Sequence, residues 1–176
     1  MFLKYQQYPE YKKTNFEMTL SEFKPIFMYE YLHRILGRII GIIFFIPLLY
    51  FTIRKAIPPV LIPRLYLLLI LGGFQGVLGW YMVKSGLVDD PNVSQYRLTA
   101  HLGMAVFIYS LILWTVFDLS LNYNHAIRSR IKWMSSTLTL LIFLMILSGG
   151  LVAGTRAGIP FPLSLIHISE PTRQEA

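Results

Sequence analysis

The sequence contains no cysteine among its 176 residues. This absence excludes a disulfide framework, a thiolate zinc site and an iron–sulfur cluster held by this chain alone. Charged residues are also scarce, at 14%, whereas 55% of the residues are apolar and the mean hydropathy is positive. Such a composition excludes a disordered chain and an ordinary soluble domain. The first residues show neither an apolar run nor a small-residue cleavage site, so we expect no secretory signal peptide.

The apolar residues are concentrated in four stretches, each close to the length of about 20 residues that crosses a membrane. These stretches cover residues 31–53, 65–82, 96–121 and 133–154. Short turns between them require neighbouring helices to be antiparallel. We therefore predict an all-α membrane protein with four transmembrane helices in an up-down bundle, which occupies residues 29–158.

A polar and aromatic segment, residues 1–28, precedes this bundle on the outer side. Within it, Thr19 and Glu22 have the spacing of a helix-capping box in front of Phe23. We expect this box to begin a short helix lying on the membrane surface.

Lysine and arginine predict the orientation of the bundle. The formal net charge is +7, and these cations gather at the ends of the apolar stretches, where they act as topology signals. Residues 54–64 and 122–132 are basic without an acid, whereas residues 83–95 hold two aspartates. The two basic loops are therefore assigned to the cytoplasm or matrix, although lysines in the N-terminal segment oppose this assignment.

One histidine stands near the outer end of each of two parallel helices. Equal numbers of residues separate His33 from Ile53 and His101 from Leu121, so both imidazoles are predicted to lie at one depth. Metal-binding side chains within a membrane usually face the bundle interior. A facing pair of histidines on a four-helix bundle favours haem iron over zinc, which needs further ligands. The alternative is that each histidine only forms hydrogen bonds at the headgroup boundary.

Glycines near the histidines leave room for a flat macrocycle. Gly37 and Gly41 follow His33 at successive turns of one face, and the second stretch adds further glycines at positions 72, 73, 76 and 79. The alternative is that these glycines only let helices approach closely, as small residues do in membranes.

Charged neighbours accompany the histidines. Arg34, Arg38 and Arg97 are candidate partners for haem propionates, because guanidinium groups suit carboxylates; snorkelling or topology-setting arginines are the alternative. Glu30, one turn before His33, could orient the imidazole or act on a bound ligand. It could equally pair with Arg34 at the i+4 position.

Three segments carry a resemblance to a known family. They are Glu30-Tyr31-Leu32-His33-Arg34 with Gly37, Arg38 and Gly41; the run from Phe74 to Leu87; and the run from Val93 to Gly103. Together they resemble haem A synthase of the alphaproteobacterial and mitochondrial type, and the resemblance extends from the N-terminal Tyr5-Gln6-Gln7-Tyr8 to about Gly158. The missing cysteines fit this branch.

The resemblance implies eight membrane helices in two four-helix halves, each half with a histidine pair. This chain would then be a truncated fragment of the N-terminal half. It would supply helices two to four without the first, and its fourth stretch would close that half. Residues 159–176 look like a non-native sequencing artefact, and we expect them to lie outside the fold.

The implied activity is oxidation of a haem O methyl group to the formyl group of haem A, for terminal oxidase assembly. Glu30 would be catalytic, and His33 and His101 would flank the iron of haem O. A haem b cofactor would belong to the other half, so the fragment alone should be inactive.

The implied surroundings are a bacterial or mitochondrial inner membrane and its lipid. The implied partners are a ferredoxin-type or quinol electron donor, haem O synthase and oxidase assembly factors, with no nucleic acid. The residues also permit two alternatives: a bis-histidine b-type cytochrome that carries electrons, and a structural bundle with interfacial histidines. The acid beside the ligand favours the enzyme, because an electron carrier has no evident need for Glu30.

Overall fold

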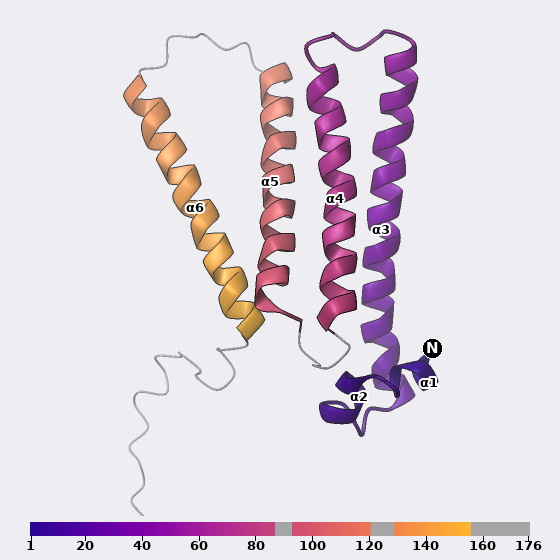
Figure 1. Cartoon of the computed structure of the whole chain (residues 1–176). Helices are drawn as coiled ribbons and strands as arrows, with labels where there is room; N and C mark the ends of the chain where they lie inside the picture. The colour runs from indigo at the N-terminus through magenta and orange to yellow at the C-terminus, as the bar shows by residue number, and fades with distance from the viewer. Residues whose placement is uncertain (87–92, 121–128, 156–176) are drawn as a thin grey trace, which may run out of the picture.

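The structure is a computed structural model that describes residues 1–86, 93–120 and 129–155, and the regular structure of these residues is helical (Figure 1). Its elements are α1 (Phe2–Tyr5), α2 (Pro9–Lys13), α3 (Leu20–Ile53), α4 (Ile62–Gly86), α5 (Gln95–Ser120) and α6 (Ser129–Thr155). The last four are long and apolar enough to cross a membrane. This confirms the predicted all-α, up-down membrane architecture. Parts of both predicted turns and the whole segment 159–176 lie outside the described residues.

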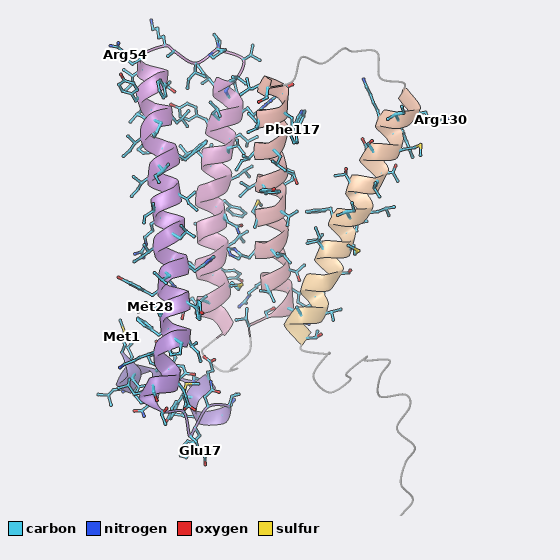
Figure 2. All side chains as sticks on the ribbon, turned by 180° about the vertical axis from the view of Figure 1, so that it is seen from behind. Met1, Glu17, Met28, Arg54, Phe117 and Arg130 are labelled. Carbon is cyan, nitrogen blue, oxygen red and sulfur yellow. The ribbon has the colours of Figure 1, made fainter. Side chains whose placement is uncertain are left out.

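The four long helices pack in chain order, each against the next. The short helices α1 and α2 lie at the end where α3 begins, which the charge pattern assigns to the outer side (Figure 1). From that end toward the opposite one, α6 leans progressively away from α5, as both views show (Figures 1 and 2). Few side chains are buried in the described residues, and most large apolar ones are exposed, as expected of helices that face lipid.

The capping box predicted at Thr19 is confirmed. The Thr19 backbone N–H donates to Glu22 Oε2 at 2.8 Å, and the Glu22 N–H donates to Thr19 Oγ1 at 3.4 Å. The box begins the 34-residue helix α3, however, and the separate short surface helix expected there is wrong. Helix α3 continues through both Pro25 and Pro47 and across the predicted boundary at residue 28. Hydropathy alone does not reveal this start, because residues 20–30 of α3 precede the apolar stretch that begins at residue 31.

Aromatic rings attach the N-terminal segment to the first turns of α3. The ring of Phe23 lies 5.3 Å from that of Phe2 and 4.8 Å from that of Tyr5, centroid to centroid. On α3 itself Phe23, Phe27 and Tyr31 stack at successive turns, with centroids 5.7 and 5.9 Å apart. The segment formed by residues 1–18, here called the outer lobe, is therefore packed on the helix that carries His33.

Two different contacts join the later helices. At the outer end α5 and α6 approach so closely that a Cβ added to Gly154 would lie 2.5 Å from Gln95 Cα, and one added to Gly150 would lie 3.1 Å from Thr99 Oγ1. At the opposite end Arg64 of α4 donates to Asp118 Oδ2 of α5 at 2.8 Å. Small residues thus fix α6 to α5 at the outer end, and an ion pair ties α4 to α5 at the inner one.

Candidate functional site: two histidines beside an open glycine face

His101 on α5 is seated against α4. A Cβ added to Gly79 would come within 3.0 Å of His101 Cε1 and 3.5 Å of His101 Nε2. The imidazole fits there only because glycine has no side chain. From the sequence, Gly79 is one of the glycines predicted to leave room for a macrocycle. In the structure the His101 ring occupies the space beside Gly79.

Gln75 lies one turn before Gly79 and touches the same residue. Its Nε2 donates to the backbone carbonyl of His101 at 3.1 Å. Two further atoms at this contact, Gln75 Oε1 and His101 Nδ1, are buried without a hydrogen-bond partner among the described residues. No role for Gln75 is predicted from the residues of the sequence. The feature that could have pointed to it is a polar carboxamide side chain within an otherwise apolar stretch.

His33 stands on α3 and His101 near the start of α5, and α4 packs against both of these helices. The His33 side chain is exposed, whereas that of His101 is half-buried. The approach of the two imidazoles to each other, which the sequence predicts, stays a prediction.

Several glycines of α3 and α4 face open space. A Cβ added to Gly37 or Gly41 of α3 would meet no atom within 4 Å. The same is true of α4 at Gly72, Gly73 and Gly76. Helix packing therefore does not close these positions, and the flat macrocycle expected beside them stays a prediction.

Glu30 is held by Arg34. The two side chains form an ion pair at i, i+4 on α3, and each is 52% exposed. The carboxylate therefore bonds to a guanidinium rather than to the His33 imidazole, which was the other orientation considered from the sequence. At this exposure the pair contributes little stability, because solvent screens it. It is therefore free to exchange partners when a ligand arrives.

The other two candidate arginines differ in their surroundings. Arg97 lies one turn before His101 on α5, and its guanidinium carbon stands 4.5 Å from the ring centroid of Tyr81 on α4. Stacking of this kind stabilises a guanidinium in one orientation. Arg38 is exposed on α3, one turn beyond Arg34. The cations thus lie on both helices that carry the histidines.

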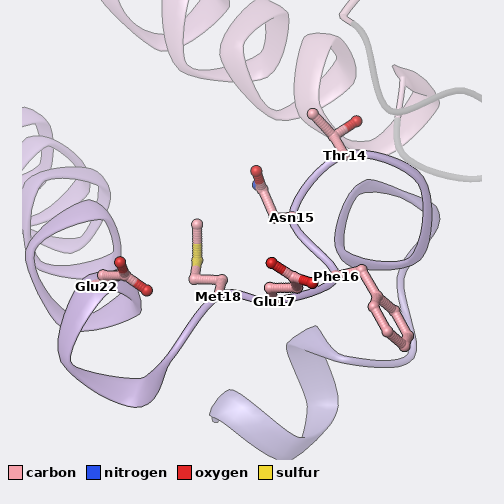
Figure 3. A pocket seen from close by; sticks show the side chains of 6 residues that line it. All are labelled: Thr14, Asn15, Phe16, Glu17, Met18 and Glu22. Atoms are coloured by element: carbon pink, nitrogen blue, oxygen red, sulfur yellow. The ribbon is translucent and has the colours of Figure 1, made fainter.

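The hollow drawn in Figure 3 is separate from these residues. It lies in the outer lobe and at the start of α3, lined by Thr14, Asn15, Phe16, Glu17, Met18 and Glu22. It is wide and open to solvent. None of the predicted haem-binding side chains lines it.

The donor set fits a haem better than a bare metal ion. Among the described residues no group of three or more His, Asp or Glu side chains could hold a metal. A metal held by protein alone usually needs at least three such ligands, whereas a porphyrin supplies the remaining nitrogens itself. Two histidines, glycines that face open space and guanidinium groups on the same two helices as the histidines therefore suit a flat iron macrocycle with carboxylates.

Comparison with known proteins adds a family to this geometry. The profile of the family described as cytochrome oxidase assembly protein, COX15-CtaA, matches residues 1–171. Curated proteins named heme A synthase are similar to the chain: one from Nitrosospira multiformis is 51% identical over 97% of this chain and 50% of its own length. Others come from Parvibaculum lavamentivorans, at 45% identity over 88% of this chain and 45% of its own, and Flavobacterium psychrophilum, at 41% over 90% and 47%. The chain spans about half the length of these relatives, and no solved structure matches it.

Proposed function

Because the chain belongs to the COX15-CtaA family of cytochrome oxidase assembly proteins, we propose that it forms the haem O-binding half of a haem A synthase. The observation that carries the proposal is the seat of His101 against Gly79, and the open positions Gly37 and Gly41 that follow His33 on α3 support it further. The relatives named heme A synthase support the reaction. The activity is oxidation of a methyl group of haem O to the formyl group of haem A.

Helices α3, α4 and α5 each contribute to this site. His33 of α3 and His101 of α5 would hold the iron of the substrate. Arg97, held on the Tyr81 ring, and Arg38 bind the propionates as the macrocycle lies over the open glycines. The seat at Gly79 fixes the His101 ring, which lowers the entropy lost when the iron binds.

Glu30 acts on the substrate or on its ligand. Its carboxylate is paired with Arg34, and both groups are half-exposed, so the carboxylate is accessible to a bound substrate. Arg34 in turn offers a second guanidinium to a propionate once Glu30 leaves it. A ferredoxin-type or quinol partner would be the electron donor, and haem b belongs to the part of the longer relatives that this chain does not span.

The setting is a bacterial or mitochondrial inner membrane. Haem O synthase and terminal-oxidase assembly factors are the corresponding neighbours, before and after this reaction.

Titration of the purified chain with haem tests the site. In detergent or lipid discs the chain should bind ferric haem with a low-spin, bis-histidine spectrum, and His33→Ala or His101→Ala should each weaken binding and change the spectrum to high spin. Thr139→Val is the matched control, since Thr139 donates only to the Ser135 carbonyl of its own helix. Unchanged spectra in both histidine variants would refute the ligand pair.

A further inference from the structure

Three atoms at the contact of α4 with α5 carry an inference about how His101 is prepared. Gln75 Nε2 donates to the His101 carbonyl, and Gln75 Oε1 and His101 Nδ1 are both buried without partners among the described residues. We propose that Gln75 is a positioning residue for His101: its Oε1 accepts the Nδ1–H of the imidazole and leaves Nε2 free for iron. The inference rests on the haem site proposed above.

The polarity of the contact decides which tautomer results. A backbone carbonyl can only accept a hydrogen bond, so the NH₂ end of the carboxamide must face it. The oxygen end is then the part of Gln75 left for the imidazole, and it too can only accept. An acceptor beside Nδ1 favours the tautomer with the proton on Nδ1. The lone pair of Nε2 is then available to a metal.

The free-energy cost of the two unpaired atoms favours the same arrangement. A buried polar atom without a partner costs about 1–3 kcal/mol. Two such atoms of opposite capacity, one acceptor and one potential donor, stand on the two residues joined by the 3.1 Å bond. Rotation of the Gln75 side chain that brings its Oε1 to His101 Nδ1 removes both costs at once, so their pairing is favoured.

Gly79 limits how far the ring can move. It follows Gln75 by one turn, so both face His101 from the same side of α4. A Cβ at residue 79 would press on Cε1 at 3.0 Å, the ring atom between the two nitrogens. Gly79 therefore limits how closely the His101 ring approaches α4, and Gln75 determines the orientation of the ring and which of its nitrogens carries the proton.

The tautomer can be measured without haem. Nitrogen-15 histidine spectra of the apo chain in lipid, recorded above the ordinary pKa of histidine, should show His101 with its proton on Nδ1; the signal is assigned by its loss in His101→Phe. Gln75→Leu should shift His101 toward the Nε2–H form, and Gln75→Glu, which keeps an acceptor oxygen, should restore the Nδ1–H form. Thr99→Val is the control, because it removes another unpaired buried polar atom of α5 while leaving Gln75 in place.

Haem binding gives the second measurement. Gln75→Leu should weaken ferric haem binding about tenfold to a hundredfold, the usual effect of losing the partner of a metal-bound histidine. It should also raise the midpoint potential of the bound haem, because the imidazole donates less charge, whereas Gln75→Glu should lower it. Gly79→Ala should weaken binding as well, while Gly149→Ala, on an open position of α6, should leave it unchanged.

The outcomes separate this inference from the proposed function. An Nε2–H tautomer in the wild-type chain, or a tautomer and potential unaffected by Gln75→Leu, overturns the role of Gln75 even if haem binds through both histidines. Haem binding that survives His101→Ala unchanged overturns the haem site, while the tautomer measured in the apo chain still reports on Gln75.

Discussion

At the scale of single residues, the site combines fixed and loose parts. The His101 ring packs against Gly79 and its backbone carbonyl accepts from Gln75, both on the neighbouring helix, whereas His33, Glu30 and Arg34 are exposed on α3. A ligand on a fixed residue binds with little loss of entropy, and one on a loose residue can adapt. We therefore expect His101 to determine where a haem lies and α3 to close on it.

Glu30 gives the first prediction at this scale. Glu30→Gln removes the negative charge and the proton acceptor but keeps the size of the side chain. In a full-length protein carrying this sequence, haem A formation should fall by about 10²-fold or more, the usual contribution of an acid–base group. The bound haem spectrum should persist, because the histidines are untouched.

Pigment analysis of membranes supplied with haem O measures this effect. Glu17→Gln is a matched control, since Glu17 lies in the outer lobe away from both histidines. Normal haem A formation in Glu30→Gln, or equal loss in Glu17→Gln, would contradict the assigned role.

At the scale of helices, hydropathy predicted the number and order of the membrane elements but not their ends. The second and third stretches lie within α4 (Ile62–Gly86) and α5 (Gln95–Ser120) to within a few residues. Helix α3 begins eleven residues before its apolar stretch, because the capping box at Thr19 starts a helix whose first turns lie outside the lipid. The apolar pattern indicates which residues can face lipid, whereas a capping residue marks where a helix begins or ends.

The same limit applies to the site. Spacing along the chain predicts that His33 and His101 lie at one depth, because depth depends only on the rise per residue of each helix. The contact of Gln75 and Gly79 with His101 depends on the rotation and height of α4 against α5. Those quantities arise from packing between helices and leave no periodic signal in a single sequence.

Gly154→Ala is the prediction at this scale. The added Cβ would lie 2.5 Å from backbone Cα of Gln95, which cannot rotate aside. The outer ends of α5 and α6 must then separate, at a cost of about 1–3 kcal/mol. Unfolding in mixed detergent should occur earlier, and spin labels on the two helices should move apart.

Gly149→Ala serves as the matched substitution, because its added Cβ would meet no atom within 4 Å on the same helix. Equal stability of the two alanine variants would show that the close approach of α5 and α6 does not depend on Gly154.

At the scale of the whole molecule, the proposed haem site belongs to a chain that matches only part of its longer relatives. It spans about half of their length, and α3 and α4 leave their glycines open. A site lacking one wall admits water and loses packing contacts. The chain alone should therefore bind haem more weakly than a full-length relative does.

We also expect the chain alone to produce no haem A, because without the second haem electrons have no route to the bound substrate. The measurement is a reduced-minus-oxidised spectrum with pigment analysis, in a strain that lacks its own synthase and receives haem O. A full-length relative expressed in the same strain is the control. Haem A made by the chain alone would show that one half suffices for the reaction.

The continuity of α3 joins the outer lobe to the helix that carries His33. At about 1.5 Å per residue, this 34-residue helix is roughly 50 Å long, against about 30 Å for the hydrocarbon layer of a membrane. The outer lobe packs on its first turns through Phe23, and Phe23, Phe27 and Tyr31 stack along the helix past Pro25. The helix is therefore longer than the layer is thick, so that the outer lobe and His33 stand on one unbroken helix of which part extends beyond the lipid.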